Sequence, residues 1–236
     1  MTDDIVRLTA PNPSPMTLEG TNTYLVGRDP AVVIDPGPDD AGHIEAIRQA
    51  AAARGGIGTV LLTHGHGDHS DGVDALGIEP ARNVDGVTVA GLRAIATPGH
   101  AADHFCFLLG KACFTGDLIL GMGSTIVGPR DTGGSLLDYM RSLERLQRLD
   151  LDVLYPGHGP EIHDPQAKIA EYVEHRMMRE RRLVAALDRG ERSRAALLAE
   201  VWDDVPDQLR GPAAIAMEAH LEKLQDEGRL PTDLRD

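Results

Sequence analysis

The chain has 236 residues, 42% of them hydrophobic and 25% charged, so it can form one sizeable α/β domain and a small second domain. This composition excludes a disordered chain, and the formal net charge of −14 argues against a general nucleic-acid binder, which needs clustered Lys and Arg. Because only 3% of the residues are aromatic, we expect a core of Val, Ile, Leu and Ala.

The compartment is inferred from the N-terminus and the cysteines. The segment MTDDIVRLTA has neither the basic start nor the apolar run of a signal peptide, and no stretch approaches the roughly 20 apolar residues of a membrane span. Cys106 and Cys113 lie in apolar runs, which is typical of buried thiols in a reducing compartment. We therefore expect a cytoplasmic protein with no disulfide and no membrane segment.

The first part of the chain has the pattern of short strands and one helix. Residues 23–28 and 31–37 are predicted to be two strands of a hairpin, and residues 59–64 a buried strand. Between them, residues 41–56 have a helical pattern that ends at Gly55.

Three later segments share one pattern. Residues 92–100, 112–117 and 152–159 each consist of an apolar run, a Pro or Gly turn, and then a His or Asp. Because open α/β sheets commonly place their sites at strand ends, this repetition predicts that the polar residues converge on one site.

The rest of the chain is mainly helical. Residues 121–135 form a glycine-rich segment that we expect to border a substrate cleft, and residues 135–149 form an amphipathic helix. A soft boundary near residue 175 separates a predicted α/β domain, 1–175, from a small helical domain, 176–236. Three more helices are predicted over residues 168–190, 194–202 and 213–230.

Many arginines lie between Arg130 and Arg194. One interpretation is a local basic surface for nucleic acid. We favour the other, a solvated helix face whose charges pair at i,i+4 spacing.

The densest group of polar residues is LLTHGHGDHSDG, residues 61–72. His64 and His66 project to the same side of extended backbone, and the intervening glycines let Asp68 and His69 turn back toward them. Four ligating groups in six residues exceed what one tetrahedral ion would take from a short loop, so the segment predicts two adjacent ions. Imidazole and carboxylate donors without thiolate suit Zn, Mn or Fe better than Ca or Mg.

Two ions need more ligands than one loop supplies. His100, Asp117 and His158 each follow an apolar strand and can complete the set. The candidate metal ligands are therefore His64, His66, Asp68, His69, His100, Asp117 and His158.

The motif THGHGDHSDG resembles the H-x-H-x-D-H signature of the metallo-β-lactamase superfamily. VVIDPG, ATPGH, FTGD and YPGHG are similar to its other four motifs and follow in the expected order, over roughly residues 15–165. The resemblance implies an α/β protein, an αββα sandwich, that acts as a metal-dependent hydrolase with two zinc ions.

Within that superfamily, residues 12–27 and 155–180 resemble a branch that contains a mitochondrial β-lactamase-like endoribonuclease and many bacterial hydrolases. The branch carries a small winged-helix-like C-terminal domain. Two departures leave the substrate open: residues 72–98 are shorter than in the endoribonucleases, and the tail after Leu230 ends without the strands of a full wing.

The resemblance also implies how the ligands are shared. One ion would be held by His64, His66 and His100, the other by Asp68, His69 and His158, with Asp117 bridging. Asp35 would orient the ligands without touching metal, a role that some carboxylate must fill.

Other polar residues have more than one interpretation. Asp68 could hold the attacking hydroxide by a hydrogen bond, so it is our candidate catalytic residue as well as a ligand. His175, Arg176 and Arg179 are either a substrate clamp for phosphate or carboxylate or a helix packed on the main domain, and we favour packing. His104 is interpreted as a structural histidine.

A second group of residues is given no catalytic role. His43 needs no special role on its helix. Asn22, Thr23 and Tyr24 either face the pocket or cap a strand.

The leading functional hypothesis is hydrolysis of an ester-like bond by metal-activated water, in a small molecule or in single-stranded nucleic acid. The bond would be an RNA phosphodiester or a thioester of the hydroxyacylglutathione type. A hypothesis of another class is a winged-helix DNA-binding regulator, which the acidic residues Glu218, Glu222, Asp226 and Glu227 disfavour. We expect the tail to serve instead in forming a homodimer or as a lid.

Overall fold

The computed structural model describes residues 4–235, which divide into two compact units. The first comprises the chain up to Thr97, Asp103–Thr125 and Arg148–Gln166, and the second Pro98–Ala102, Ile126–Gln147 and the chain from Ala167 onward. The predicted boundary near residue 175 falls inside a helix of the structure and stays a prediction. The predicted lack of a signal peptide rests partly on residues 1–3, which lie outside the described residues.

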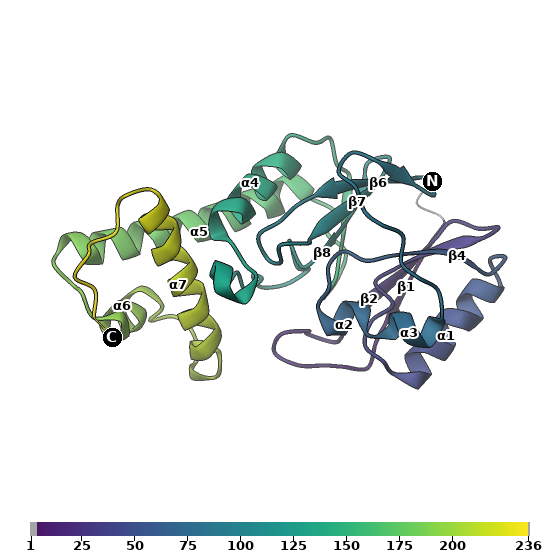
Figure 1. Ribbon diagram of the computed structural model, residues 1–236, viewed down its shortest axis with the longest axis horizontal. Coiled ribbons are helices and arrows are strands. Elements are labelled where there is room, and N and C mark those ends of the chain that lie inside the picture. Colours follow the sequence, from purple (N-terminus) through teal and green to yellow (C-terminus); the bar gives the residue numbers. More distant parts are fainter. Residues whose placement is uncertain (1–3, 236) are drawn as a thin grey trace. The chain divides into compact units, whose positions relative to one another are not determined.

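The first unit contains two sheets (Figure 1). In the first sheet only the β3–β4 pair is parallel, and in the second only β8–β9. The predicted strands are present, whereas β1, β5 and β7 lie outside the predicted ranges. The strands are β1 (Ile5–Thr9), β2 (Asn22–Val26), β3 (Ala31–Ile34), β4 (Ile57–Leu61), β5 (Thr88–Val89), β6 (Leu92–Ala96), β7 (Phe105–Leu109), β8 (Ala112–Gly116) and β9 (Val153–Pro156).

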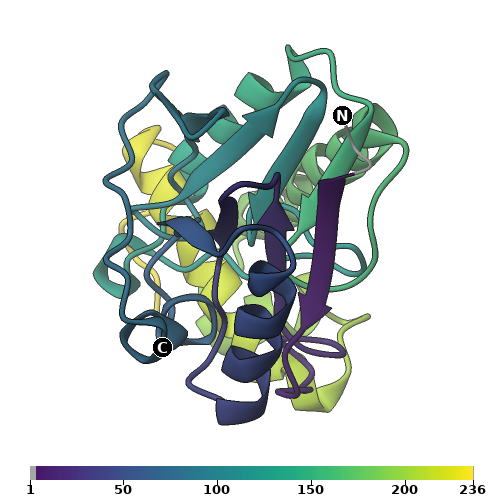
Figure 2. The same cartoon turned by 90° about the vertical axis from the view of Figure 1, so that its right-hand side faces the viewer.

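The two sheets bury one shared core. Strand residues alternate between faces, so Tyr24 and Val26 pack with residues of the second sheet, while Leu25 packs against helix α1 (Ala41–Ala52). The Tyr24 ring contacts the ring of Phe114 at a centroid distance of 5.2 Å. The core therefore uses part of the scarce aromatic content besides the expected aliphatic residues. Figure 2 shows α1 lying along the first sheet.

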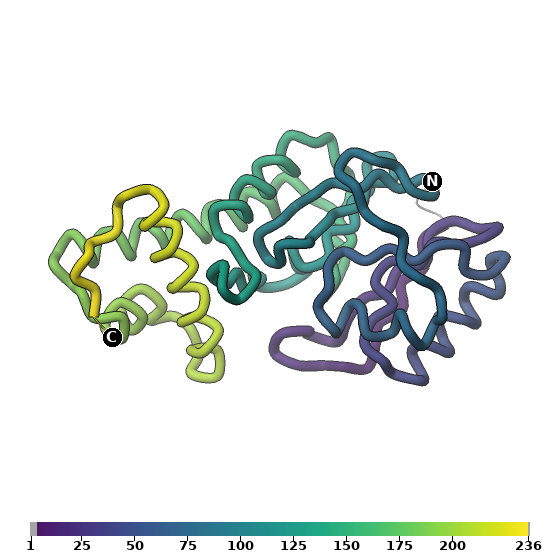
Figure 3. Tube along the Cα trace, in the orientation of Figure 1, coloured from purple at the N-terminus to yellow at the C-terminus, as the bar shows by residue number. Residues whose placement is uncertain are grey.

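The second unit is helical, as Figure 3 shows along the chain from residue 167 onward. Helix α5 and the two helices after it bury a core of Leu, Val, Met and the single tryptophan, Trp202. Within residues 4–235 no helix combines the length and apolar character needed to cross a membrane. The longer α-helices after α1 are α4 (Leu136–Gln147), α5 (Pro165–Asp188), α6 (Arg194–Val201) and α7 (Arg210–Asp226).

The arginines of the second unit form ion pairs, mostly between elements rather than at i,i+4 spacing. Arg179 donates to both carboxylate oxygens of Asp204, at 2.7 and 2.9 Å, and to the carbonyl of Val201. This agrees with the paired-charge interpretation rather than with a free basic surface. Further pairs in this unit include Arg181–Glu174, Arg182–Asp203, Arg189–Glu200, Arg192–Asp233 and Arg194–Glu218.

Two histidines of the second unit are held neutral. His220 on α7 is 1% exposed, and neither ring nitrogen has a hydrogen-bond partner among the described residues. Burial, reinforced by the charge of Arg176, holds the pKa of His220 well below its ordinary value. Burial and the neighbouring Arg176 and Arg179 lower the pKa of His175 to about 4.

From the lowered pKa values of these two histidines, we predict that acid destabilises the second unit. Below pH ~6.5 these two histidines take up protons in the unfolded chain but not in the folded unit. The free energy of unfolding therefore has its full value above that pH and falls as the pH drops toward 4. The fluorescence of Trp202 should show a lower urea midpoint at pH 5 than at pH 7. His220→Leu should reduce this difference, whereas replacing the exposed His163 by Gln should not. An undiminished pH dependence in His220→Leu would contradict the assignment.

Candidate metal centre

The predicted ligand loop follows strand β4 and enters the short helix α2 (Gly67–Ser70). His66 precedes the first helical residue, and Asp68 and His69 lie on the single turn of α2. A Cβ at position 67 would lie 2.7 Å from Asp71 Oδ2, so a side chain there would have to displace the exposed Asp71 carboxylate. The loop thus returns Asp68 and His69 toward the preceding histidines, as the sequence predicted.

Four of the predicted residues surround one point in the first unit. His158 Nε2 lies 3.2 Å from Asp68 Oδ2 and 3.4 Å from Asp117 Oδ1. His69 Nε2 lies 3.6 and 3.4 Å from the same two oxygens. Ligands ~2.0–2.2 Å from a tetrahedral zinc would be separated by about 3.3–3.6 Å. The spacing of these donor atoms therefore fits a metal ion.

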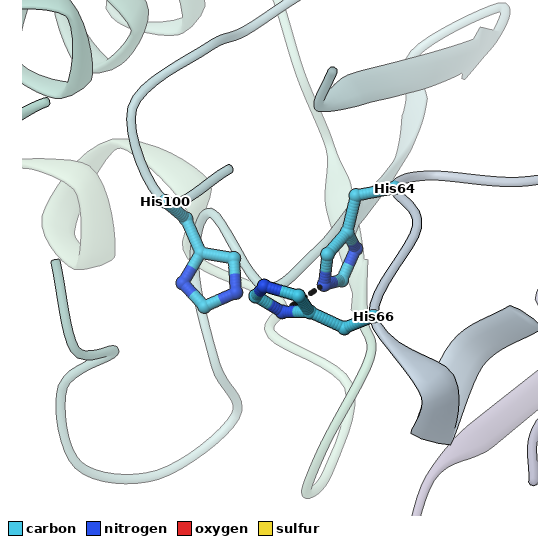
Figure 4. Close-up of side chains that lie close together, drawn as sticks. All are labelled: His64, His66 and His100. Atoms are coloured by element: carbon cyan, nitrogen blue, oxygen red, sulfur yellow. Dashed lines mark hydrogen bonds between the residues drawn. The ribbon is translucent and has the colours of Figure 1, made fainter. Parts of the chain in front are cut away.

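The remaining predicted ligands form a neighbouring group. Figure 4 shows the rings of His64, His66 and His100 close together, with His64 Nε2 only 2.9 Å from His66 Nδ1. The Nδ1–H of His100 donates to the carbonyl of Ile126 at 2.9 Å, which leaves Nε2 able to bind a cation. Within each of three groups of residues, the ligand atoms all lie within 4.8 Å of one another. The groups are His64, His66 and His100; His64, His69 and Asp117; and Asp68, His69 and His158.

Asp35 lies next to His69 and Thr63. It is 2% exposed and accepts hydrogen bonds from His69 Nδ1 at 2.9 Å and from Thr63 Oγ1 and the Thr63 amide, both at 2.7 Å. Since the Thr63 hydroxyl donates to Asp35, it accepts from His64 Nδ1 at 3.0 Å. Asp35 thus fixes the His69 ring directly and the His64 ring through Thr63.

Several positioning residues were not identified from the sequence. The Asn22 amide donates to the carbonyls of Pro156 and Gly159, at 3.0 and 2.9 Å, and so holds the turn that carries His158. The Tyr24 hydroxyl also donates to Pro156 O. The only sequence signal was their place at the start of a strand, which could not name partners more than a hundred residues away.

Charge compensation links the carboxylates to the imidazoles. Burial alone would raise the pKa of Asp117, but the charge of His69 and the hydrogen bond from His158 hold it well below its ordinary value. Burial would lower the pKa of His158, yet Asp117 and Asp68 raise it to about 9. His69 Nε2 is fully buried and makes no hydrogen bond among the described residues, although carboxylate oxygens face it. Such a donor set suits a cation.

The residues predicted to contact substrate lie in the second unit. Arg176 and Arg179 are each 4% exposed. The Arg176 guanidinium lies 5.3 Å from the centre of the Tyr139 ring, and Arg179 is paired with Asp204. His175 lies on the same helix. The role of these three residues in binding substrate stays a prediction, since no contact among the described residues supports it.

His104 lies in the first unit, at the start of β7. It is 1% exposed, and its Nδ1 lies 2.9 Å from Thr97 Oγ1, a contact typical of a structural histidine.

Two family models match the chain. The one described as "Metallo-beta-lactamase superfamily" matches residues 16–77 and 73–158. The one described as "Beta-lactamase associated winged helix domain" matches residues 193–231. In the tail, an isolated bridge joins Ser193 to Arg235.

Individual relatives agree with these matches. A Beta-lactamase-like protein 2 homolog of Caenorhabditis elegans is 35% identical over 260 residues, covering 97% of this chain and 86% of the relative. An Atrochrysone carboxyl ACP thioesterase of Aspergillus fumigatus is 38% identical over 216 residues, covering 80% and 67%. A solved metallo-beta-lactamase family protein from Thermus thermophilus has a TM-score of 0.74 at 26% identity, covering 96% of this chain and 94% of that one.

The close packing of Gly157 against the constellation gives a direct test. A Cβ at this position would lie 2.6 Å from Asp117 Oδ1 and 2.7 Å from His69 Cε1. Gly157→Ala should therefore displace both groups and weaken zinc binding by on the order of tenfold or more, measured by competition with a chelator. Gly211→Ala is the matched control, because a Cβ there meets no atom within 4 Å. Equal zinc affinity in both variants would contradict this geometry.

Proposed function

Because the chain belongs to the metallo-β-lactamase superfamily, whose members are hydrolases, we propose that it cleaves an ester-like bond at a binuclear zinc centre. The observation that carries the proposal is the convergence of the three donor groups from separate strand ends. We assign His64, His66 and His100 to one ion and Asp68, His69 and His158 to the other. Asp117 is assigned as the bridge, because its ligand atom groups with those of His64, from the first set, and His69, from the second.

The proposed chemistry divides between the ions and the chain. When bound, the ions would lower the pKa of water toward neutrality and polarise the scissile bond. Asp35 keeps the His69 and His64 rings in the tautomer that presents Nε2 as the ligand atom. The Asp68 side chain is 31% exposed, compared with 12% for Asp117, so it is the better placed to accept a hydrogen bond from the attacking water.

An acyl thioester is the substrate class that we favour. A relative over most of this chain is named as an acyl-carrier-protein thioesterase. The endoribonuclease alternative needs cations free to bind phosphate, whereas the arginines from Arg179 to Arg194 are engaged with carboxylates.

The DNA-binding alternative depends on α7. That helix carries Glu218, Glu222 and Asp226, and Glu222 and Asp226 contact Arg130. Glu227 directly follows its last residue. Such a surface is poorly suited to phosphate.

The metal and the compartment are also part of the proposal. Five imidazoles and two carboxylates suit zinc, with manganese and iron as the alternatives. Cys106 and Cys113 are buried free thiols, in keeping with a cytoplasmic enzyme.

The reaction class can be settled with a substrate panel. Zinc-loaded protein would be assayed on an acyl thioester, S-lactoylglutathione, single-stranded RNA, a nitrophenyl phosphodiester and a chromogenic cephalosporin. We expect turnover of the thioesters that falls by at least two orders of magnitude in His66→Ala, since this variant removes a ligand. Cleavage of RNA alone would overturn the thioester assignment, and equal activity of His66→Ala would indicate a contaminant.

Asp68 is expected to contribute to both metal binding and rate. Asp68→Ala should lower zinc affinity, and at saturating zinc it should still reduce kcat by on the order of a hundredfold, because the water loses its hydrogen-bond acceptor. Zinc content and kcat would be measured on the same preparation. Full zinc occupancy with full turnover would contradict both roles.

A further inference from the structure

Helix α1 places one buried histidine against the end of the strand that carries Asp35. His43 is 4% exposed, and its Nε2 lies 2.8 Å from Thr23 Oγ1. The Thr23 hydroxyl, itself fully buried, lies 2.6 Å from the backbone carbonyl of Asp35. These three residues come from α1, β2 and the end of β3, and His43 touches none of the proposed metal ligands through these contacts.

The direction of each hydrogen bond in this chain is fixed by chemistry. The Asp35 carbonyl can only accept, so the Thr23 hydroxyl donates its single proton to it. The hydroxyl oxygen must then accept from His43 Nε2–H. Burial lowers the pKa of His43, with Asp40 opposing, and this favours the neutral ring.

The held carbonyl belongs to a residue in an unusual conformation. Asp35 has φ +51, which is uncommon for a non-glycine residue and persists only where its surroundings enforce it. His43 also packs against Gly37, two residues after Asp35. A Cβ on Gly37 would lie 3.1 Å from the His43 ring. The Gly37 amide donates to the carbonyl of His69 at 3.1 Å. The ring therefore contacts the turn whose far side carries the Asp35 carboxylate.

We propose that His43 is a positioning residue for the metal centre. Acting through Thr23, it holds the Asp35 backbone in the left-handed conformation from which the carboxylate orients His69 directly and His64 through Thr63. The inference rests on the proposed function, because it requires these histidines to bind metal. The position of His43 in an amphipathic helix did not indicate this role.

The test compares zinc binding in two variants of His43. His43→Leu removes the donor to Thr23, whereas the amide of His43→Gln can still donate. Competition with a chromogenic chelator should show zinc affinity reduced about tenfold or more in His43→Leu and largely restored in His43→Gln. If His43→Leu does not fold, Thr23→Val and Thr23→Ser provide the same comparison, with loss in the first and recovery in the second.

Ile47→Ala is the control for simple destabilisation of α1. Ile47 is fully buried on the same helix and packs in the core between α1 and the first sheet. It should lower the urea midpoint and leave zinc affinity unchanged.

Three outcomes oppose the proposal. Wild-type affinity in His43→Leu would overturn it, and so would a loss of affinity in His43→Gln or in Ile47→Ala as large as that in His43→Leu. Wild-type protein that binds no zinc would overturn the proposed function as well, so the two failures are distinguishable.

Discussion

Negative charge buried beside imidazole is the constraint on which the site depends. The Asp117 side chain is 12% exposed and that of Asp68 31%, so neither carboxylate can rely on water alone for solvation. Their charge is compensated by His69 and His158, and the same arrangement of donors suits a divalent cation. Superfamily members bind divalent metals, and the chain provides carboxylate and imidazole donors that suit such an ion. The surrounding hydrogen bonds serve mainly to hold these few groups at fixed separations.

The two-sheet architecture explains how residues from distant parts of the sequence meet. Strands β4, β8 and β9 each end in a turn that carries donor groups, and the shared core fixes the positions of those ends. Residues at the strand starts then hold the turns from behind, as Asn22 does for the turn that carries His158. The core therefore contributes to function indirectly, because it keeps the separate turns in register.

The sequence predicted the parts of this protein that depend on local pattern. The alternating apolar runs predicted most strands, and the spacing of His64, His66 and His69 predicted a convergent donor set. The roles of Thr63, Thr23 and His43 could not be predicted, because each depends on a partner brought close only by folding. The arginine-rich stretch shows the same limit: composition left two interpretations open, and the carboxylates that distinguish them lie on α6 and in the turn after it.

The segment that carries His100 has a further consequence. Although it lies between β6 and β7, residues 98–102 group with the second unit. Ser135 donates its amide proton to Gly99 O and Ser142 its hydroxyl proton to Pro98 O, both at 2.8 Å, and a Cβ on Gly99 would collide with the Tyr139 backbone. These contacts limit where this protein can be recombined with a homologue, because residues 98–102 and the helical unit have to match. A chimera that exchanges the helical unit must inherit the Pro98–Ala102 insert from the same parent, or helix α4 will meet a foreign loop.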